Sequence, residues 1–434
     1  MLAYYLRLAA RSLRRQPALT ALMTVSIGLG IGASITTLTV LHVLSGDPLP
    51  GKSRSVYFVQ LDPRDKTDFH PGDEPSEQIG RRDGEALLGA RRADRQALMT
   101  GGSVPVQLDG STIEPLYADA RYTSADFFPM FDVPFRAGAP WLAADDDAHA
   151  RVAVIADALD QKLFGGAGGL GRTLRLDGTD FRIVGVLAPW RPTPHFYDLN
   201  TSTFAESEQV FVPFSTSRDL GLARNGSMDC WGAVVPGHET DSDVPCVWLQ
   251  LWVELGTPAK AAAYRDYLQG YAEEQRAAGR YERPTVVRLR NVTEWLDFKR
   301  VVPSDVRLQN WLAFAFLVVC MVNTVGLLLA KFLRRSSEIA IRRSLGASRR
   351  AVSGQFLTEA GMVGLAGGVL GLGLAVLGLW AVRQQTAEYV SLARLDPSML
   401  IATFALAVAA SLLAGLLPAW RACAVPPAAQ LKAD

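Results

Sequence analysis

ALTALMTVSIGLGIGASITTLTVLHVLSG, residues 18–46, is a run of 29 residues without Asp, Glu, Lys or Arg. Three later stretches share this property: 308–330, 360–382 and 397–420. About 20 helical residues cross a hydrocarbon core of roughly 30 Å, so each stretch can span a bilayer. A charge at the middle of such a helix costs about 2.5 to 3.5 kcal/mol, so four charge-free stretches favour membrane helices over a soluble core. The first is too long for a signal peptide, whose apolar part has about 7 to 15 residues, and we expect an uncleaved anchor.

A large domain separates the first and second spans. Residues 152–157 read as a buried strand, followed by a short helix and by a hairpin that turns at Asp177-Gly178. Thr257-Pro258 is typical of a helix start, and we expect that helix to run to about Ala278. Further strands are expected at 54–61, 210–214, 247–255 and 284–290. The pattern predicts an α+β module with two lobes, joined or capped by a less regular segment over 190–246.

The segment GDPLPGKS, residues 46–53, matches the phosphate-binding pattern G-x-x-x-x-G-K-[ST]. That pattern works by aiming backbone N–H groups at phosphate and then opening a helix. Pro48 and Pro50 have no N–H, and the segment that follows reads as a strand. We interpret the match as fortuitous and expect neither an enzyme active site nor a nucleotide bound by this chain.

The distribution of basic residues predicts the orientation. Four arginines and no acid precede the first span, and the 331–359 loop carries seven basic residues against two acids. Such segments stay in the cytoplasm. We expect a lipid-embedded protein of the bacterial inner membrane with both termini in the cytoplasm. Residues 1–17 form either an amphipathic helix on the membrane surface or a plain basic flank. The expected order is cytoplasmic segment 1–17, span 18–46, periplasmic domain 47–307, span 308–330, cytoplasmic loop 331–359, span 360–382, periplasmic loop 383–396, span 397–420 and cytoplasmic tail 421–434.

Few residues carry recognisable chemistry. Cys230 and Cys246 lie in the periplasmic domain, where they either pair or remain thiols. No C-x-x-C or H-E-x-x-H occurs, so we expect no metal site, and nothing indicates a nucleic-acid partner. The four spans contain no ionisable residue except His42, so a proton pathway lacks its usual marker. Gly28-x-x-x-Gly32 and Gly364-x-x-x-Gly368 permit close approach of helices, and dimerisation is one use of such motifs.

Two regions resemble a known family. EIAIRRSLGASRR, residues 338–350, followed by QFLTEA, residues 355–360, is similar to the signature of FtsX-type permeases. In the large domain, residues 126–131, 152–155, 164–165 and 171–186 resemble the periplasmic core domain of MacB-type macrolide exporters. Full-length exporters of that type carry an ATPase domain before the first span, whereas 17 residues precede it here. The resemblance therefore implies a separate ABC ATPase chain, which uses ATP and Mg²⁺.

The resemblance also assigns a contact to the cytoplasmic loop, a coupling helix that sits on the ATPase. The residues it implies are Glu338, Ile339, Ala340, Ile341, Arg342, Arg343, Leu345, Gly346 and Ala347. The pattern agrees, because Ile341 and Leu345 are one helical turn apart, and Gly346 can end this helix before Ser348 caps the next. The alternative, that these arginines only fix the topology, does not explain the apolar pair.

Three functions fit this family. The first is an export permease for antibiotics, peptides or similar amphiphiles, moved by ATP hydrolysis. Its implied partners are the ATPase, a second permease that is identical or paralogous, a periplasmic adaptor and an outer-membrane channel. The alternatives are an FtsX-like signalling protein that activates a cell-wall hydrolase, and a permease that releases lipoproteins.

Overall fold

The computed structural model describes residues 2–108, 115–335, 341, 344–345, 347–384 and 397–424. The chain divides into two compact units, which are treated separately below. The helical unit consists of residues 1–45 and 302–434, and the sheet unit of residues 46–301.

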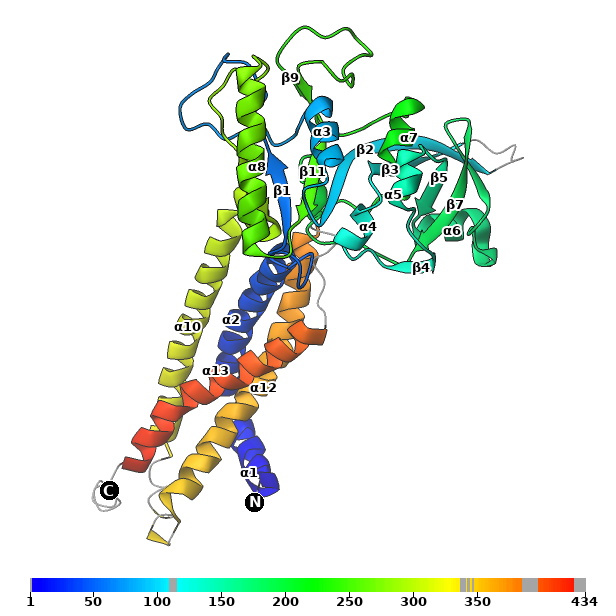
Figure 1. The fold of residues 1–434 in the computed structure, drawn as a ribbon. Coiled ribbons are helices and arrows are strands. Elements are labelled where there is room, and N and C mark those ends of the chain that lie inside the picture. Colours follow the sequence, from blue (N-terminus) through cyan, green and yellow to red (C-terminus); the bar gives the residue numbers. More distant parts are fainter. Residues whose placement is uncertain are drawn as a thin grey trace. The chain divides into compact units, whose positions relative to one another are not determined.

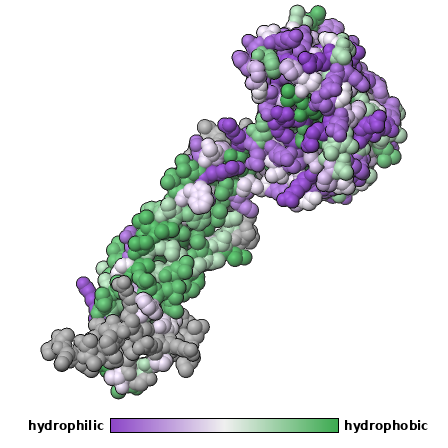
Figure 2. Space-filling model, turned by 60° about the vertical axis from the view of Figure 1, so that its left-hand side comes forward, coloured by the Kyte–Doolittle hydropathy of each residue, from purple (hydrophilic) through white to green (hydrophobic). Residues whose placement is uncertain are grey.

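The helical unit contains five described helices longer than three turns (Figure 1). They are α1 (Leu2–Arg15), α2 (Pro17–Leu44), α10 (Ser304–Leu333), α12 (Arg349–Val382) and α13 (Pro397–Ala424). All but α1 contain a stretch long and apolar enough to cross a membrane. Figure 2 shows apolar side chains over much of the visible face of this unit. The prediction of four membrane helices, one before and three after the large domain, is confirmed.

Glycines set how closely these helices pack. A Cβ atom at Gly28 would lie 2.9 Å from Leu370 Cδ2, and one at Gly32 would lie 2.7 Å from Leu374 Cβ. Glycine therefore lets α2 touch α12. On the other side of α12, a Cβ at Gly364 would lie 2.0 Å from Ser411 Oγ of α13. Both glycine motifs are thus used between helices of one chain.

The helix α1 packs on α12. Its Ala9 and Ser12 side chains are buried. The segment 1–17 is therefore largely helical, but part of its surface is covered by protein rather than resting on a membrane surface.

The sheet unit is built on one mixed ten-stranded sheet in the order β12-β1-β11-β2-β3-β8-β5-β7-β4, with β6 beside β2 and β7. The strands are β1 (Val56–Gln60), β2 (Arg95–Leu108), β3 (Leu116–Thr123), β4 (Phe135–Gly138), β5 (Val152–Ile155), β6 (Thr173–Leu176), β7 (Thr179–Leu187), β8 (Val210–Pro213), β11 (Gln250–Glu254) and β12 (Arg288–Asn291). A separate pair consists of β9 (Asp229–Cys230) and β10 (Cys246–Val247). The helices are α3 (Arg81–Ala90), α4 (Phe127–Met130), α5 (Ala143–Asp147), α6 (Asp157–Phe164), α7 (Phe214–Asp219), α8 (Pro258–Ala277) and α9 (Val292–Phe298), with short 3₁₀ turns η1 (Gly165–Ala167) and η2 (Phe196–Asp198).

Local signals in the sequence explain several of these elements. Asp177 and Gly178 both have positive φ, 44° and 76°, as a tight hairpin between β6 and β7 requires. The Thr257 hydroxyl accepts a hydrogen bond from the Lys260 amide at the start of α8. The core of the unit gathers buried side chains from β1, β2, β3, β5, β7, β8, β11 and α8.

The sheet corrects two expectations. The sequence pattern predicts two lobes built from strand–helix–strand units, but one sheet runs through the unit, because β3 pairs with β8 and β2 with β11. The single strand expected over 247–255 is instead β10 and β11. Between them Leu249 forms an isolated antiparallel bridge with Ile79.

Candidate functional site

The segment predicted to contact an ATPase lies between α10 and α12. Glu338, Ile339, Ala340, Arg342, Arg343 and Gly346 lie outside the described residues. The Leu345 amide donates a hydrogen bond to the Ile341 carbonyl at 3.1 Å, which closes one helical turn. The Ile341 side chain is 53% exposed and that of Leu345 is 82% exposed. Ala347 packs against the core of the helical unit. The turn therefore presents two apolar side chains, an arrangement suited to a protein contact.

Ser348, which follows Ala347, determines where α12 begins. The Ser348 hydroxyl accepts a hydrogen bond from the Ala351 amide at 3.2 Å, which makes Ser348 the N-cap of α12. The capping role predicted for Ser348 is confirmed. Three residues, 346–348, separate the exposed turn from Arg349, the first residue of α12.

Four polar side chains, three of them buried and Arg335 partly exposed, form a group that we call the Glu359 cluster: Ser12, Lys331, Arg335 and Glu359. Lys331 and Glu359 have no exposed surface, and Lys331 Nζ donates to Glu359 Oε1. The Ser12 hydroxyl donates to the same oxygen at 2.5 Å. Arg335 Nη1 donates to Ser12 Oγ at 2.6 Å and lies 3.7 Å from Glu359 Oε2. The Glu359 carboxylate on α12 therefore contacts polar side chains of α1, of α10 and of the residues just after α10.

The cluster overturns the expectation that the membrane helices bury no ionisable residue. Lys331 and Glu359 lie one residue beyond the charge-free stretches 308–330 and 360–382. The helices continue past those stretches, α10 to Leu333 and α12 from Arg349, so both side chains fall between packed helices. The neighbouring rings of Phe332 and Phe356 contact each other with centroids 4.0 Å apart and planes tilted by 31°.

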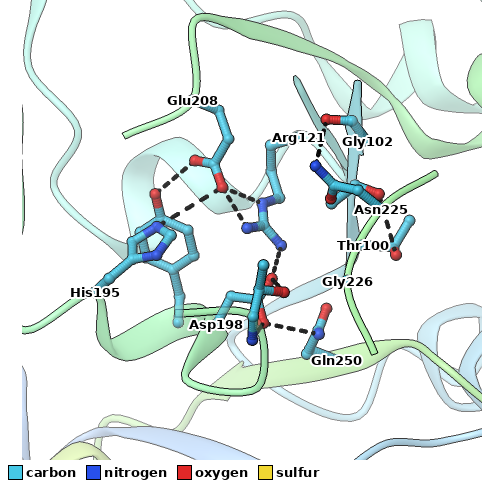
Figure 3. A network of polar contacts seen from close by, with 12 residues as sticks. Thr100, Gly102, Arg121, His195, Asp198, Glu208, Asn225, Gly226 and Gln250 are labelled. Atoms are coloured by element: carbon cyan, nitrogen blue, oxygen red, sulfur yellow. Dashed lines mark hydrogen bonds and ion pairs between the residues drawn. The ribbon is translucent and has the colours of Figure 1, made fainter. Parts of the chain in front are cut away.

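A second buried polar group lies in the sheet unit (Figure 3). Arg121 on β3 donates from Nε to Glu208 Oε1 at 2.9 Å and from Nη1 to Asp198 Oδ2 at 2.8 Å. The Tyr197 hydroxyl donates to Glu208 Oε2 at 2.7 Å, and His195 Nε2 lies 3.7 Å from Oε1. Burial is the largest single influence on the pKa of Glu208 and would raise it, but the Arg121 and His195 charges and their hydrogen bonds together outweigh burial and hold that pKa well below its usual range.

This arrangement joins segments distant in the sequence. Arg121 belongs to β3, Asp198 to η2, and Gln250 of β11 donates from Nε2 to Asp198 Oδ1 at 3.2 Å. All of these side chains are buried, so the group is placed to hold the irregular 190–209 segment on the sheet rather than to meet a substrate. Among the described residues, no group of three His, Cys, Asp or Glu side chains could hold a metal ion.

The structure also describes the two cysteines of the sheet unit and the loop 46–53, which the sequence offers as candidate sites. Cys230 and Cys246 face each other on β9 and β10 and form a disulfide. In the loop 46–53, Lys52 Nζ donates to the Pro129 carbonyl at 2.8 Å and pairs with Asp132. This loop leads into β1 and not into a helix. The loop therefore lacks the geometry of a phosphate site.

Comparisons with known proteins give the family. The family model for the MacB-like periplasmic core domain matches residues 20–271, and the model for the FtsX-like permease C-terminal region matches residues 310–427. The pyoverdine export ATP-binding/permease protein PvdT of Pseudomonas aeruginosa is 25% identical over 71% of this chain and 41% of its own length. The macrolide export ATP-binding/permease protein MacB of Azoarcus sp. is 24% identical over 99% of this chain and 59% of its own length.

Less than two thirds of either relative is therefore matched. Among solved structures, the periplasmic region of MacB from Actinobacillus actinomycetemcomitans aligns with 60% of this chain and 98% of its own, with 13% identity and a TM-score of 0.37. The extracellular domain of the transporter YknZ from Gram-positive bacteria aligns with 51% of this chain and 95% of its own, with 12% identity and a TM-score of 0.33. The core-domain model alone matches more than half of the chain, and the permease model matches most of the rest. The chain belongs to the MacB- and FtsX-type family of ABC transporter permeases.

Proposed function

We propose that this chain is the permease of an ABC-type efflux system, in which ATP hydrolysis by a partner ATPase moves the sheet unit and expels a substrate. The observation that carries the proposal is the exposed Ile341–Leu345 turn, which lies in the chain between Lys331 and Glu359, the ion pair of the Glu359 cluster. A partner that binds two exposed apolar side chains gains their burial, roughly 1.5 to 3 kcal/mol for each. The turn is followed by α12, whose Glu359 contacts α1 and α10, so we expect a displacement of the turn to shift these helices.

The proposed assembly contains more than this chain. ATP and Mg²⁺ act at the ATPase and not on the permease. ABC ATPases work in pairs, so the complex holds two permeases, identical or paralogous. A periplasmic adaptor and an outer-membrane channel complete an export route. The names of the relatives, which refer to pyoverdine export and macrolide export, support an amphiphilic substrate such as an antibiotic or peptide.

The proposed location is the bacterial inner membrane. Both termini and the Ile341–Leu345 turn face the cytoplasm, and residues 47–307 face the periplasm. The excess of Lys and Arg in the N-terminal segment and in the 331–359 loop supports this orientation. The disulfide between Cys230 and Cys246 is consistent with an oxidising compartment for the sheet unit.

A charge placed on the turn tests the proposal. In Leu345→Asp a carboxylate replaces an apolar side chain at the contact, so an ABC ATPase should no longer co-purify from native membranes. Leu142→Asp is the matched control, because Leu142 is also a strongly exposed leucine, 68%, but lies in the sheet unit. Mass spectrometry of both preparations measures ATPase recovery against permease recovery. An ATPase that is recovered equally with Leu345→Asp and with the wild type would refute the contact. A cell-wall hydrolase partner in place of an export adaptor would instead favour the signalling function.

A further inference from the structure

A polar side chain lies on the exposed face of α10. Asn323 is exposed, whereas a separate face of the helix, which includes Leu317, Cys320 and Leu328, is buried. Seven residues before the end of the 308–330 stretch, Asn323 is about 10 Å inside the hydrocarbon region at a rise of 1.5 Å per residue. The structure gives Asn323 no hydrogen-bond partner within the described part of the chain. Lipid tails offer none either, and an unpaired amide in hydrocarbon is costly.

The exposed residues around Asn323 follow a heptad pattern. Successive members are separated alternately by four and three residues, which is the spacing of two helices that pack with a slight left-handed twist. We call this set the α10 stripe: Leu312, Phe316, Val319, Asn323, Gly326, Ala330 and Leu333, every one of them exposed. In this pattern Asn323 occupies an a position, where a single asparagine is known to fix the register of paired helices.

The same stripe is open to a close neighbour. A Cβ atom added at Gly326 would meet no heavy atom within 4 Å. Gly326 and Ala330 lie one and two turns from Asn323 and are both small, so the backbone of a second helix can come near the amide. The glycine pairs of α2 and α12 cannot serve this purpose, because their neighbours within the chain already fill them.

We infer that α10 pairs with α10 of a second copy of this chain along the α10 stripe, with the two Asn323 amides hydrogen-bonded to each other. Two copies inserted in the same direction are related by a two-fold axis along the membrane normal, which brings Asn323 opposite Asn323 at one depth. An amide carries both a donor and an acceptor, so each copy satisfies the other. The inference rests on the two-permease assembly proposed above, and it adds the helix, the face and the register.

Two neighbouring valines provide the test. Val318 is 57% exposed and Val319 is 56% exposed, but they point about 100° apart around the helix and only Val319 belongs to the stripe. In full-length chain carrying Cys320→Ala and Cys423→Ser, oxidation of native membranes should crosslink Val319→Cys to a dimer and leave Val318→Cys monomeric. Equal crosslinking of both, or of neither, would overturn the α10 pairing. A crosslink from Val319→Cys to a different permease would overturn the choice of a second copy.

A second measurement addresses the amide itself. Asn323→Val should weaken dimerisation about tenfold in lipid vesicles, measured by energy transfer between labelled copies, since the hydrogen bonds between the two amides are lost together. An unchanged dissociation constant would refute the amide pair. ATPase recovery is measured on the same variants. If the ATPase co-purifies while the crosslink is absent, the α10 pairing fails and the proposed function stands; a crosslink without any ATPase shows the reverse.

Discussion

The Glu359 cluster makes a quantitative prediction about buried charge. Glu359→Gln keeps the size of the side chain but removes the anion, so Lys331, which has no exposed surface, loses the one carboxylate it contacts in the described part of the chain. Removing one member of a buried ion pair costs about 3 to 5 kcal/mol, because the other charge stays desolvated. Lys331→Met should cost less, since Ser12 still donates to the carboxylate and Arg335 lies 3.7 Å from Oε2.

A double variant measures the interaction energy between Lys331 and Glu359 apart from their contacts with other residues. With Lys331→Met and Glu359→Gln together, neither charge is left buried alone, so the combined cost should fall below the sum of the single costs by about 2 to 3 kcal/mol. The assay is SDS-induced unfolding of the full chain in mixed micelles, followed by tryptophan fluorescence. Arg334→Met is the control, because it removes an exposed basic side chain next to the end of α10 and should change stability by less than about 0.5 kcal/mol. Strictly additive costs, or a Glu359→Gln variant as stable as the control, would refute this reasoning.

Two further predictions concern the sheet unit. Burial raises the pKa of Asp146 to about 6, although the Ala125 amide and the Trp141 indole donate hydrogen bonds to its carboxylate. The folded state therefore holds this proton more tightly than the unfolded state, so the Asp146 contribution to stability is lost as pH rises through about 6. Carboxyl ¹³C NMR should show a midpoint near pH 6 for Asp146, and a midpoint near the ordinary value of about 4 would contradict it. Arg121→Met should destabilise the unit by about 3 to 5 kcal/mol at neutral pH, because Glu208 and Asp198 then remain buried without a cation. Chemical denaturation checks this cost, which should shrink in acid; a cost that does not change with pH would argue against the pairing.

Local signals carried much of what the sequence predicted. The hairpin at Asp177-Gly178, the capped start of α8 at Thr257 and the cap at Ser348 each depend on residues close in the chain, and each is present. The long hairpin of β2 and β3 was missed. Its first strand contains Gly101-Gly102, and two glycines weaken the sequence pattern of a strand. In the structure the Tyr122 ring of β3 lies over Gly102, where an added Cβ atom would be 2.3 Å from Tyr122 Cζ. This contact with β3 explains why the strand forms despite its glycines.

No local pattern in the sequence indicates the two buried polar groups. Arg121, Asp198 and Glu208 are separated by up to 87 residues, and nothing at any one of these positions distinguishes it from a surface charge. The charges of Lys331 and Glu359 predict that both lie in the loop 331–359, just outside the spans. Charge marks where a helix can leave lipid, but a neighbouring helix can bury a pair beyond that point. The pairing partner, which only the fold supplies, decides between these outcomes.

A buried ion pair is a poor source of stability but a good way to fix geometry, because apolar side chains of the same size would pack at least as well. The contact of Phe332 with Phe356 tolerates sliding, since dispersion changes gradually with position. The hydrogen bonds that converge on Glu359 do not, because a shift of α1 or α10 against α12 breaks at least one of them where water cannot replace it. The Ile341–Leu345 turn lies in the chain between Lys331 and Glu359, which these bonds hold together. We therefore expect that a partner pushing on this turn moves α1, α10 and α12 as one body, and that Glu359→Gln lowers transport per ATP hydrolysed more than it lowers ATPase binding.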